Sequence, residues 1–328
     1  MAQLNPHTTL PASSQDALEM FDERYNALRL LQVPQTWCEQ FGEVHPVAST
    51  STKYPMSFLA LKYLETIAGE GRFRTIAEKD TELTVVEYDD GVEIELLKLI
   101  ENAFSAKRWM DAPAGMLQAE QMFKCKSLAV MLEANTATCG WDDLALFHDS
   151  HLANPKDSSV GTFDNNQATT KTVLNVDNIA AEVALMMAVK DENGDKLGVK
   201  PTAIGVPTET YHGLVNLMKQ DIIANAAGTA SIRNPYTQDG MLKIVHMAHL
   251  TDPNDWFLFD ESLIAKGAAP WVAAKLSLSD PRFDSLGFRR FGEDSDRFKQ
   301  TGKIAISSHI WWGFKFLYPH AIRVVKGA

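Results

Sequence analysis

The clearest pattern of apolar and polar positions predicts a helix of about 22 residues near the middle of the chain, over about 112–134. Asp111 suits the N-cap position and Pro113 suits the first turn, while Asn135 marks the end of the helix. The apolar residues between them recur at three- and four-residue spacing, which places them on one stripe. This stripe predicts a face buried in the core, made of Ala119, Met122, Cys125, Ala129 and Leu132.

The N-terminal part of the chain predicts segments that need a partner surface. Residues 1–53 read as a polar arm interrupted by prolines, with one amphipathic helix predicted from about Ser14 to Leu31. Over 54–95, alternation around Leu83 and Val85 between glycine-containing turns predicts a two-stranded excursion. A lone hairpin is only marginally stable in water, so we expect both segments to lie on something else.

The second half alternates helical and strand patterns, which together with the long helix predicts an α+β fold. One predicted helix carries the stripe Ile179, Val183 and Met186, and a second is predicted to be capped by Thr208 and to carry Leu214, Leu217 and Met218. Strands are predicted over 199–206, 241–245, 256–259, 303–308, 311–317 and 322–325.

Composition and charge narrow the class of protein. The 328 residues are 45% hydrophobic, with no apolar run long enough to span a membrane and no secretory signal at the N-terminus, so we expect synthesis in the cytosol. Three scattered cysteines predict buried thiols and no disulfide framework. Acidic residues outnumber basic ones 42 to 31, which argues against tight DNA binding but allows the protein to enclose DNA without gripping it.

Two histidine pairs are the candidates for metal chemistry. His148 and His151 flank Asp149, and His246 and His249 repeat the same spacing. The metalloprotease signature needs histidines four apart with an adjacent glutamate, and zinc needs further ligands. We therefore expect structural hydrogen bonding from both pairs. A metal-dependent hydrolase that uses His148, Asp149 and His151 is the alternative from another functional class.

Other catalytic signatures are absent from the sequence. It contains no nucleophile elbow, no phosphate-binding loop and no dinucleotide-binding glycine motif, so neither an enzymatic activity nor a cofactor is expected. The stretch Phe288–Phe291 contains two arginines between aromatic residues, but Glu293, Asp294 and Asp296 follow and cancel the local charge. We interpret this region as a solvated face or a face of salt bridges between subunits.

An ordered series of short motifs extends over roughly 141–326. It begins with Leu144 to Phe147 followed by His151 to Asn154, and it closes with an aromatic strand and a Pro-x-Ala step at Pro319. The intervening motifs are Met186 to Ala188, Asp191 to Gly194, Lys200-Pro201, Gly205 to Pro207, Asn234-Pro235, Gly240, His246 and Asp255 to Phe259. This series resembles the Mu-like major head subunit family of tailed bacteriophages, and its closing part resembles tailed-phage capsid proteins generally.

The resemblance implies a phage capsid fold of the Hong-Kong-97 type. On this basis we expect an N-terminal arm over 1–53, an extended loop over 54–95, and an axial domain over 165–260. A peripheral domain would comprise 96–164 and 261–328, with the helix over about 112–134 as its spine. A subunit whose neighbours supply missing burial would explain the poorly buried arm and loop.

The implied function is that of a major capsid protein, which assembles in the host bacterial cytoplasm and resides in the virion. The protein would form hexamers and pentamers, and enclose double-stranded DNA without sequence-specific binding. Other implied partners are a scaffolding protein, a portal and a decoration protein, with no membrane. The alternative with the same fold is an encapsulin-like nanocompartment shell. The residues expected to contact neighbouring subunits are Arg72, Arg74, Glu78, Lys79, Asp80 and Glu82 in the loop, and Arg233, Asn234 and Asp239 near the capsomer centre.

Overall fold

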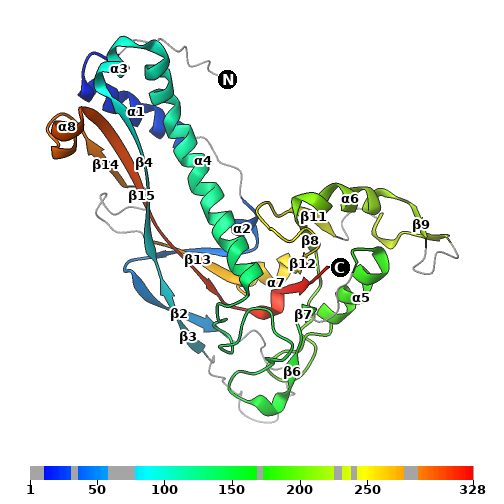
Figure 1. The fold of residues 1–328 in the computed structure, drawn as a ribbon. Helices are drawn as coiled ribbons and strands as arrows, with labels where there is room; N and C mark the ends of the chain where they lie inside the picture. Colours follow the sequence, from blue (N-terminus) through cyan, green and yellow to red (C-terminus); the bar gives the residue numbers. More distant parts are fainter. Residues whose placement is uncertain are drawn as a thin grey trace.

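One long helix, α4 (Ala103–Ala134), runs along one side of the computed structural model, which describes residues 11–30, 36–57, 78–167, 173–224, 231–237, 242–276 and 287–327 (Figure 1). The Asn102 side chain caps the helix by accepting a hydrogen bond from the Phe104 backbone, and Asn135 ends it in the left-handed conformation. The prediction that it begins near residue 112 was therefore wrong. Pro113 lies inside the helix, where packing of the preceding turns outweighs the lost hydrogen bond.

The helix predicted from Ser14 is confirmed as α1 (Ser14–Leu30), which packs against the N-terminal half of α4 (Figure 1). The Trp109 indole donates to the Ala17 carbonyl oxygen at 2.8 Å, and its ring lies 5.3 Å from that of Phe21. All three residues are buried. This part of the N-terminal segment therefore finds its partner surface within the same chain. Three short helices also flank the long one or its sheet: α2 (Trp37–Gln40), α3 (Leu96–Glu101) and α8 (Asp296–Thr301).

The first sheet is organised around one long strand, β15 (Lys303–Phe316), which spans both strands predicted over 303–308 and 311–317. Gly313 lets β15 pass close to another backbone segment, because a Cβ atom at that position would lie 1.9 Å from the Thr84 carbonyl oxygen. The strand order is β1-β13-β15-β14, with β4 also paired to β15. The bounds of the other strands are Glu43–Val47 for β1, Val86–Glu95 for β4, Trp271–Leu276 for β13 and Gly287–Phe291 for β14.

A separate two-stranded sheet pairs β2 (Ser51–Ser57) with β3 (Glu78–Thr84) in antiparallel register. The strand after it, β4, pairs with β15 and not with the hairpin. Residues 86–95 of the predicted excursion are thus part of the first sheet. Buried side chains on β2 and at the end of β3, among them Met56, Leu83 and Val85, anchor the hairpin in the main core.

The second sheet has the order β11-β8-β12-β16-β7 and lies beside helices α5 and α6 (Figure 1). The C-terminal strand β16 pairs with β12, so the range 261–328 contributes strands to both sheets. The strands are β7 (Asn166–Gln167), β8 (Ala203–Val206), β11 (Lys243–His246), β12 (Trp256–Phe259) and β16 (Ile322–Val325), with helices α5 (Val176–Met186), α6 (Thr208–Lys219) and α7 (Glu261–Ala265).

The start of α6 differs from the prediction. Pro207 occupies the N-cap position, and no side chain caps the helix there. The Thr208 hydroxyl instead forms a hydrogen bond with His246 Nε2 at 2.9 Å, which connects α6 to the end of β11. The remaining strands are short pairs, β5 (His151–Leu152) with β6 (Thr162–Phe163) and β9 (Ile222–Ala224) with β10 (Ser231–Arg233).

One large buried cluster lies between the second sheet and the C-terminal half of α4. It includes Trp256 to Phe259, together with Leu128 and Leu132 from the long helix. A smaller buried cluster joins α1 to the N-terminal half of α4 and the start of β15. Among the described residues, no helix has the length and apolar character needed to cross a membrane.

Candidate assembly surfaces

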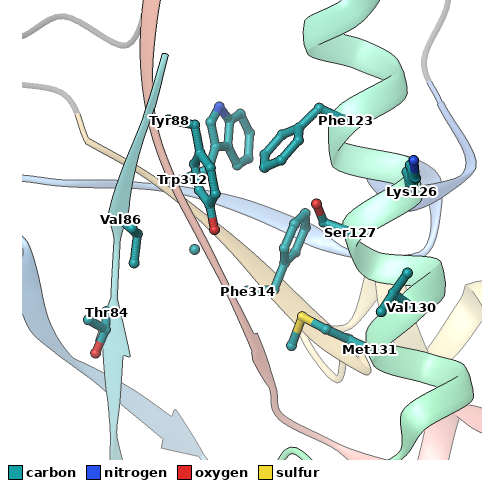
Figure 2. A pocket seen from close by; sticks show the side chains of 11 residues that line it. Thr84, Val86, Tyr88, Phe123, Lys126, Ser127, Val130, Met131, Trp312 and Phe314 are labelled. Atoms are coloured by element: carbon teal, nitrogen blue, oxygen red, sulfur yellow. The ribbon is translucent and has the colours of Figure 1, made fainter. Parts of the chain in front are cut away.

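An apolar groove lies between α4 and the first sheet (Figure 2). The helix contributes Phe123 and Val130, and the sheet contributes Val86, Tyr88 and Trp312. Figure 2 shows these side chains directed from the two elements into the space between them. The cavity measures about 590 Å³, and its other lining residues are Thr84, Lys126, Ser127, Met131, Gly313 and Phe314.

The groove exposes large apolar side chains where the described part of the chain does not cover them. Val86 is 53% exposed, Val130 is 52% exposed and Tyr88 is 41% exposed. The centres of the Tyr88 and Phe123 rings are 4.5 Å apart and the rings are tilted, so the two side chains contact each other from opposite sides of the groove. At the inner end, the Lys124 ammonium lies 4.2 Å from the centre of the Trp312 ring. A continuous apolar patch of this kind marks an interaction site more often than an ordinary surface.

The groove continues along α4 towards its N-terminus. A second hollow of about 250 Å³ shares Tyr88 and Phe123 with the first and adds Met116, Ala119 and Ile310. Near the start of α4, Phe104 is 81% exposed, and Leu97 on α3 is 65% exposed. Apolar surface is thus uncovered both along the length of the long helix and near its tip.

Sequence reasoning missed the groove, although a signal for it exists. Phe123, Val130 and Met131 form a second apolar line on α4. The prediction of one buried stripe was correct for its C-terminal part, Cys125, Ala129 and Leu132, but wrong for Met122, which is 47% exposed, and for Ala119, which is also exposed. On the sheet side, Val86 and Tyr88 alternate with the surrounding polar residues, and both line the groove as exposed side chains. A helix with apolar residues on two faces predicts a second buried contact.

The loop charges predicted to meet a neighbouring subunit fall into three groups. Arg72 and Arg74 lie outside the described residues. Lys79 bonds within its own chain, to Asp143 at 2.8 Å and to the Trp141 carbonyl oxygen at 3.0 Å. The remaining residues lie on β3: Asp80 is exposed, Glu82 is exposed and accepts a hydrogen bond from Ser51, and Glu78 belongs to the first residues of the strand.

Two of the three residues predicted near the capsomer centre, Arg233 and Asn234, lie at or just after the end of β10. Arg233 ends β10, and Asp239 lies outside the described residues. Asn234 is buried, and its side-chain nitrogen donates to the Leu217 carbonyl oxygen at 2.8 Å. Its side chain therefore connects the end of β10 to α6.

The arginines of the stretch Phe288–Phe291 form ion pairs within the chain. Arg289 bonds to Glu87 at 2.8 Å and Arg290 bonds to Asp22 at 2.5 Å. The first pair joins β14 to β4, and the second joins β14 to α1. The positive charge of the two arginines is therefore balanced by carboxylates on β4 and α1 of the same chain.

The first histidine pair makes hydrogen bonds inside the chain. His151 is buried, with Nδ1 2.8 Å from Asp142 Oδ2 and Nε2 2.9 Å from the Leu146 carbonyl oxygen. Because a carbonyl oxygen only accepts, Nε2 carries a proton. His148 Nδ1 accepts from the Ser150 backbone, which leaves that nitrogen facing its own loop. Burial raises the pKa of Asp142, but the stronger combined effect of His151 and two backbone N–H groups lowers it.

In the second pair, His246 is exposed and forms a hydrogen bond with Thr208, and His249 lies in the left-handed backbone region. Within the described ranges, no three His, Cys, Asp or Glu side chains are grouped to hold a metal ion. The structural interpretation of His148, His151 and His246 is confirmed by these hydrogen bonds.

The sequence of residues 81–325 matches the family model described as phage capsid protein. No protein of curated function matches the chain. The match spans α4, the second sheet and the first sheet apart from β1, and so covers most of the architecture described above.

Solved structures with a similar fold come from virus-like and phage particles. A chain from Microbacterium phage Oxtober96 has a TM-score of 0.52 at 10% identity, covering 93% of this chain and 99% of that one. The procapsid of bacteriophage JBD30 has a TM-score of 0.51 at 11% identity, covering 96% and 75%. The capsid of an empty GTA particle has a TM-score of 0.50 at 13% identity, covering 93% and 97%. These likenesses confirm the predicted α+β fold of the Hong-Kong-97 type.

Proposed function

The chain belongs to the phage capsid protein family, and we propose that it is the major head subunit of a tailed bacteriophage. In this proposal, copies of the chain form hexamers and pentamers, which build an icosahedral shell around double-stranded DNA. The ordered motifs over 141–326 support placement with the Mu-like head subunits. Assembly would take place in the host bacterial cytoplasm, with a scaffolding protein, a portal and a decoration protein as partners.

The single observation that carries the proposal is the uncovered apolar groove between α4 and the first sheet in a chain of this family. Exposed apolar surface is costly in water, and covering it contributes about 25 cal/mol for each Å² removed from solvent. In a closed shell built from one kind of chain, every subunit is surrounded by other copies, so a second copy can cover the groove at each position.

The segment of the neighbour that we assign to this surface is the extended loop. Its sequence between β2 and β3 contains an apolar group that complements an apolar groove: Phe58, Leu59, Leu61, Leu64 and Ile67. Arg72 and Arg74 follow and supply positive charge, while Glu78, Lys79, Asp80 and Glu82 line the strand that leads back to the body. Of these, Lys79 also joins the start of β3 to Asp143, so its intersubunit role is secondary.

The opposite end of the subunit is assigned to the capsomer centre. Arg233 at the end of β10 and Asp239 beyond it are the residues proposed to approach neighbouring copies, while Asn234 stabilises the β10 loop from inside. The net charge of −11 suits a container wall, because packed DNA that is not gripped can move in and out.

The experiment is expression of the full-length chain in bacteria, followed by electron microscopy and nuclease treatment of any particles. We expect polyhedral shells composed of pentamers and hexamers, and nuclease-protected double-stranded DNA in particles recovered from a phage lysate. A chain that remains monomeric at high concentration, also when expressed with the other head proteins, would contradict the proposal. Particles that enclose protein cargo in place of DNA would favour the nanocompartment alternative.

A further inference from the structure

Two buried thiols from distant parts of the sequence lie in contact. Cys38 on α2 and Cys125 on α4 place their sulfur atoms 3.3 Å apart, although 87 positions separate them in the chain. Cys38 is 2% exposed and Cys125 is 5% exposed. Because a disulfide bond is about 2.05 Å long, the two sulfur atoms need to approach by roughly 1.2 Å to form one.

The surroundings hold this pair in position. The Trp271 indole donates to the Cys38 carbonyl oxygen at 2.8 Å, and Lys124 lies 3.7 Å from Glu39 across the same α2–α4 contact. Gly42 fits closely against Trp271, where an added Cβ atom would lie 2.1 Å from the indole nitrogen. These contacts fix α2 against α4, so the two thiols meet as part of the folded structure.

We propose that Cys38 and Cys125 form an intrachain disulfide when the folded protein meets a peroxide, and that this bond fastens the N-terminal segment to the long helix. The bond itself does not depend on shell assembly. In a shell protein, however, it would close after release from the reducing cytoplasm, where thiols are kept reduced.

The chemistry balances with hydrogen peroxide as the oxidant. The Cys125 thiolate attacks one peroxide oxygen, the O–O bond breaks, and the departing hydroxide combines with the thiol proton to form water. The Cys38 sulfur then attacks the sulfenic sulfur, the S–O bond breaks, and the hydroxyl group leaves with the Cys38 proton as a second water. Two thiols are oxidised, and one peroxide is reduced to two waters.

The electrostatics of the pair agree with this order of attack. The hydrogen bond with Cys38 lowers the pKa of the Cys125 thiol, whereas the same bond and burial raise the pKa of Cys38. Because the thiolate is the reacting form, Cys125 is the first nucleophile and Cys38 the resolving thiol. A peroxide is small and uncharged, which suits a site with little solvent exposure.

Cys139 provides an internal control. It is fully buried, and its thiol donates to the Leu317 carbonyl oxygen at 2.7 Å. Burial also raises the pKa of the Cys139 thiol, which disfavours its reaction. Peroxide should therefore leave this cysteine as a free thiol while the other two are consumed.

The test uses the full-length protein, purified reduced and treated with hydrogen peroxide. After unfolding and alkylation, mass spectrometry should count three labelled cysteines before treatment and one after it, and that one should be Cys139. Digestion should release a Cys38–Cys125 peptide pair that separates on reduction. Oxidation should raise the Tm by roughly 3–5 °C, since the bond closes a long loop in the unfolded chain.

Two variants and one condition make the result specific. Cys38→Ser should abolish both the linked peptide and the rise in Tm, whereas Cys139→Ala should retain both. The urea-unfolded chain should not form this pair selectively. Three thiols that remain free, disulfide-linked dimers, or sulfinic acid at Cys125 beside an unreacted Cys38 would each overturn the proposal.

Discussion

Arg323 on β16 donates from Nε to the Glu182 carboxylate on α5 at 2.6 Å, and both side chains lie inside the protein. The Arg323 side chain is fully buried, and it also donates from Nη1 to the Asp164 carbonyl oxygen at 2.8 Å. One guanidinium therefore joins α5, the C-terminal strand and the segment before β7. Neither charge can recover its hydration while the second sheet stays folded.

Glu182→Ala should reduce the free energy of unfolding by about 3 kcal/mol, because it leaves the buried Arg323 guanidinium with only the longer ion pair to Asp164, at 3.5 Å. Urea unfolding followed by circular dichroism measures this change. The matched control is Lys243→Ala, which breaks the exposed Lys243–Glu261 pair and should cost less than about 1 kcal/mol. Equal costs for the two variants would show that the buried pair has no special role.

Folding stability should fall as the pH drops from 7 to 5 because of His320. This side chain is fully enclosed between Trp141 and Phe163, and burial lowers its pKa to about 3. Within the described part of the chain, neither of its ring nitrogens has a hydrogen-bond partner. The unfolded chain binds a proton near pH 6.5 and the folded chain does not, so acid favours unfolding by about 2 kcal/mol over this interval.

The His320→Phe variant isolates this effect, since phenylalanine fits an aromatic site and does not titrate. Its urea midpoint should change much less between pH 7 and pH 5 than that of the unmodified protein. Asp142 affects stability only at lower pH. Its pKa is lowered from 3.8, so its contribution to folding stability is lost only as the pH falls below that value. A variant that loses stability as steeply as the parent would contradict the assignment.

The sequence predicted the class of fold and several elements correctly, because their patterns are local. The stripe on α5 and the run Trp256–Phe259 depend on side chains that face one core. The start of α4 could not be predicted in this way. Burial of Trp109 against α1, more than 80 positions earlier, keeps the helix intact through Pro113.

The candidate surfaces were harder to predict than the fold. Polar and charged residues were the predicted contact sites, yet Lys79 and Asn234 form hydrogen bonds within their own chain. Whether a polar side chain bonds within the chain depends on contacts between residues far apart in sequence, such as Lys79 with Asp143. The groove combines residues of α4, β4 and β15, so its shape exists only once these elements pack together.

Gly313→Ala should destabilise the protein by about 2–3 kcal/mol, because a methyl group would meet the backbone of the Thr84–Val85 segment. Backbone atoms cannot move aside as a flexible side chain can. Gly115→Ala on α4 is the control, since nothing lies within 4 Å of the added atom and the site is helical. That change should stabilise the protein by about 0.5–1 kcal/mol, as measured by urea unfolding. Tolerance of alanine at Gly313 would mean that β3 and β15 do not approach this closely.

Val130→Glu should prevent assembly while leaving the isolated subunit folded. Val130 is 52% exposed in the groove, so a carboxylate there keeps access to water in the monomer and changes its stability by about 0.5 kcal/mol or less. In a shell, the same carboxylate would be buried against apolar side chains of a neighbour, which is strongly unfavourable. Size-exclusion chromatography with light scattering and electron microscopy separate the two effects.

Gln118→Glu is the matched control for this prediction, because it adds the same charge to an exposed position of α4 outside the groove. It should assemble like the parent protein. If Val130→Glu assembled equally well, the groove would not be an intersubunit contact, and the apolar tip formed by Leu97 and Phe104 would become the surface to test. If both variants failed, added negative charge on α4 would itself oppose assembly, and raising the salt concentration should then restore shells by screening it.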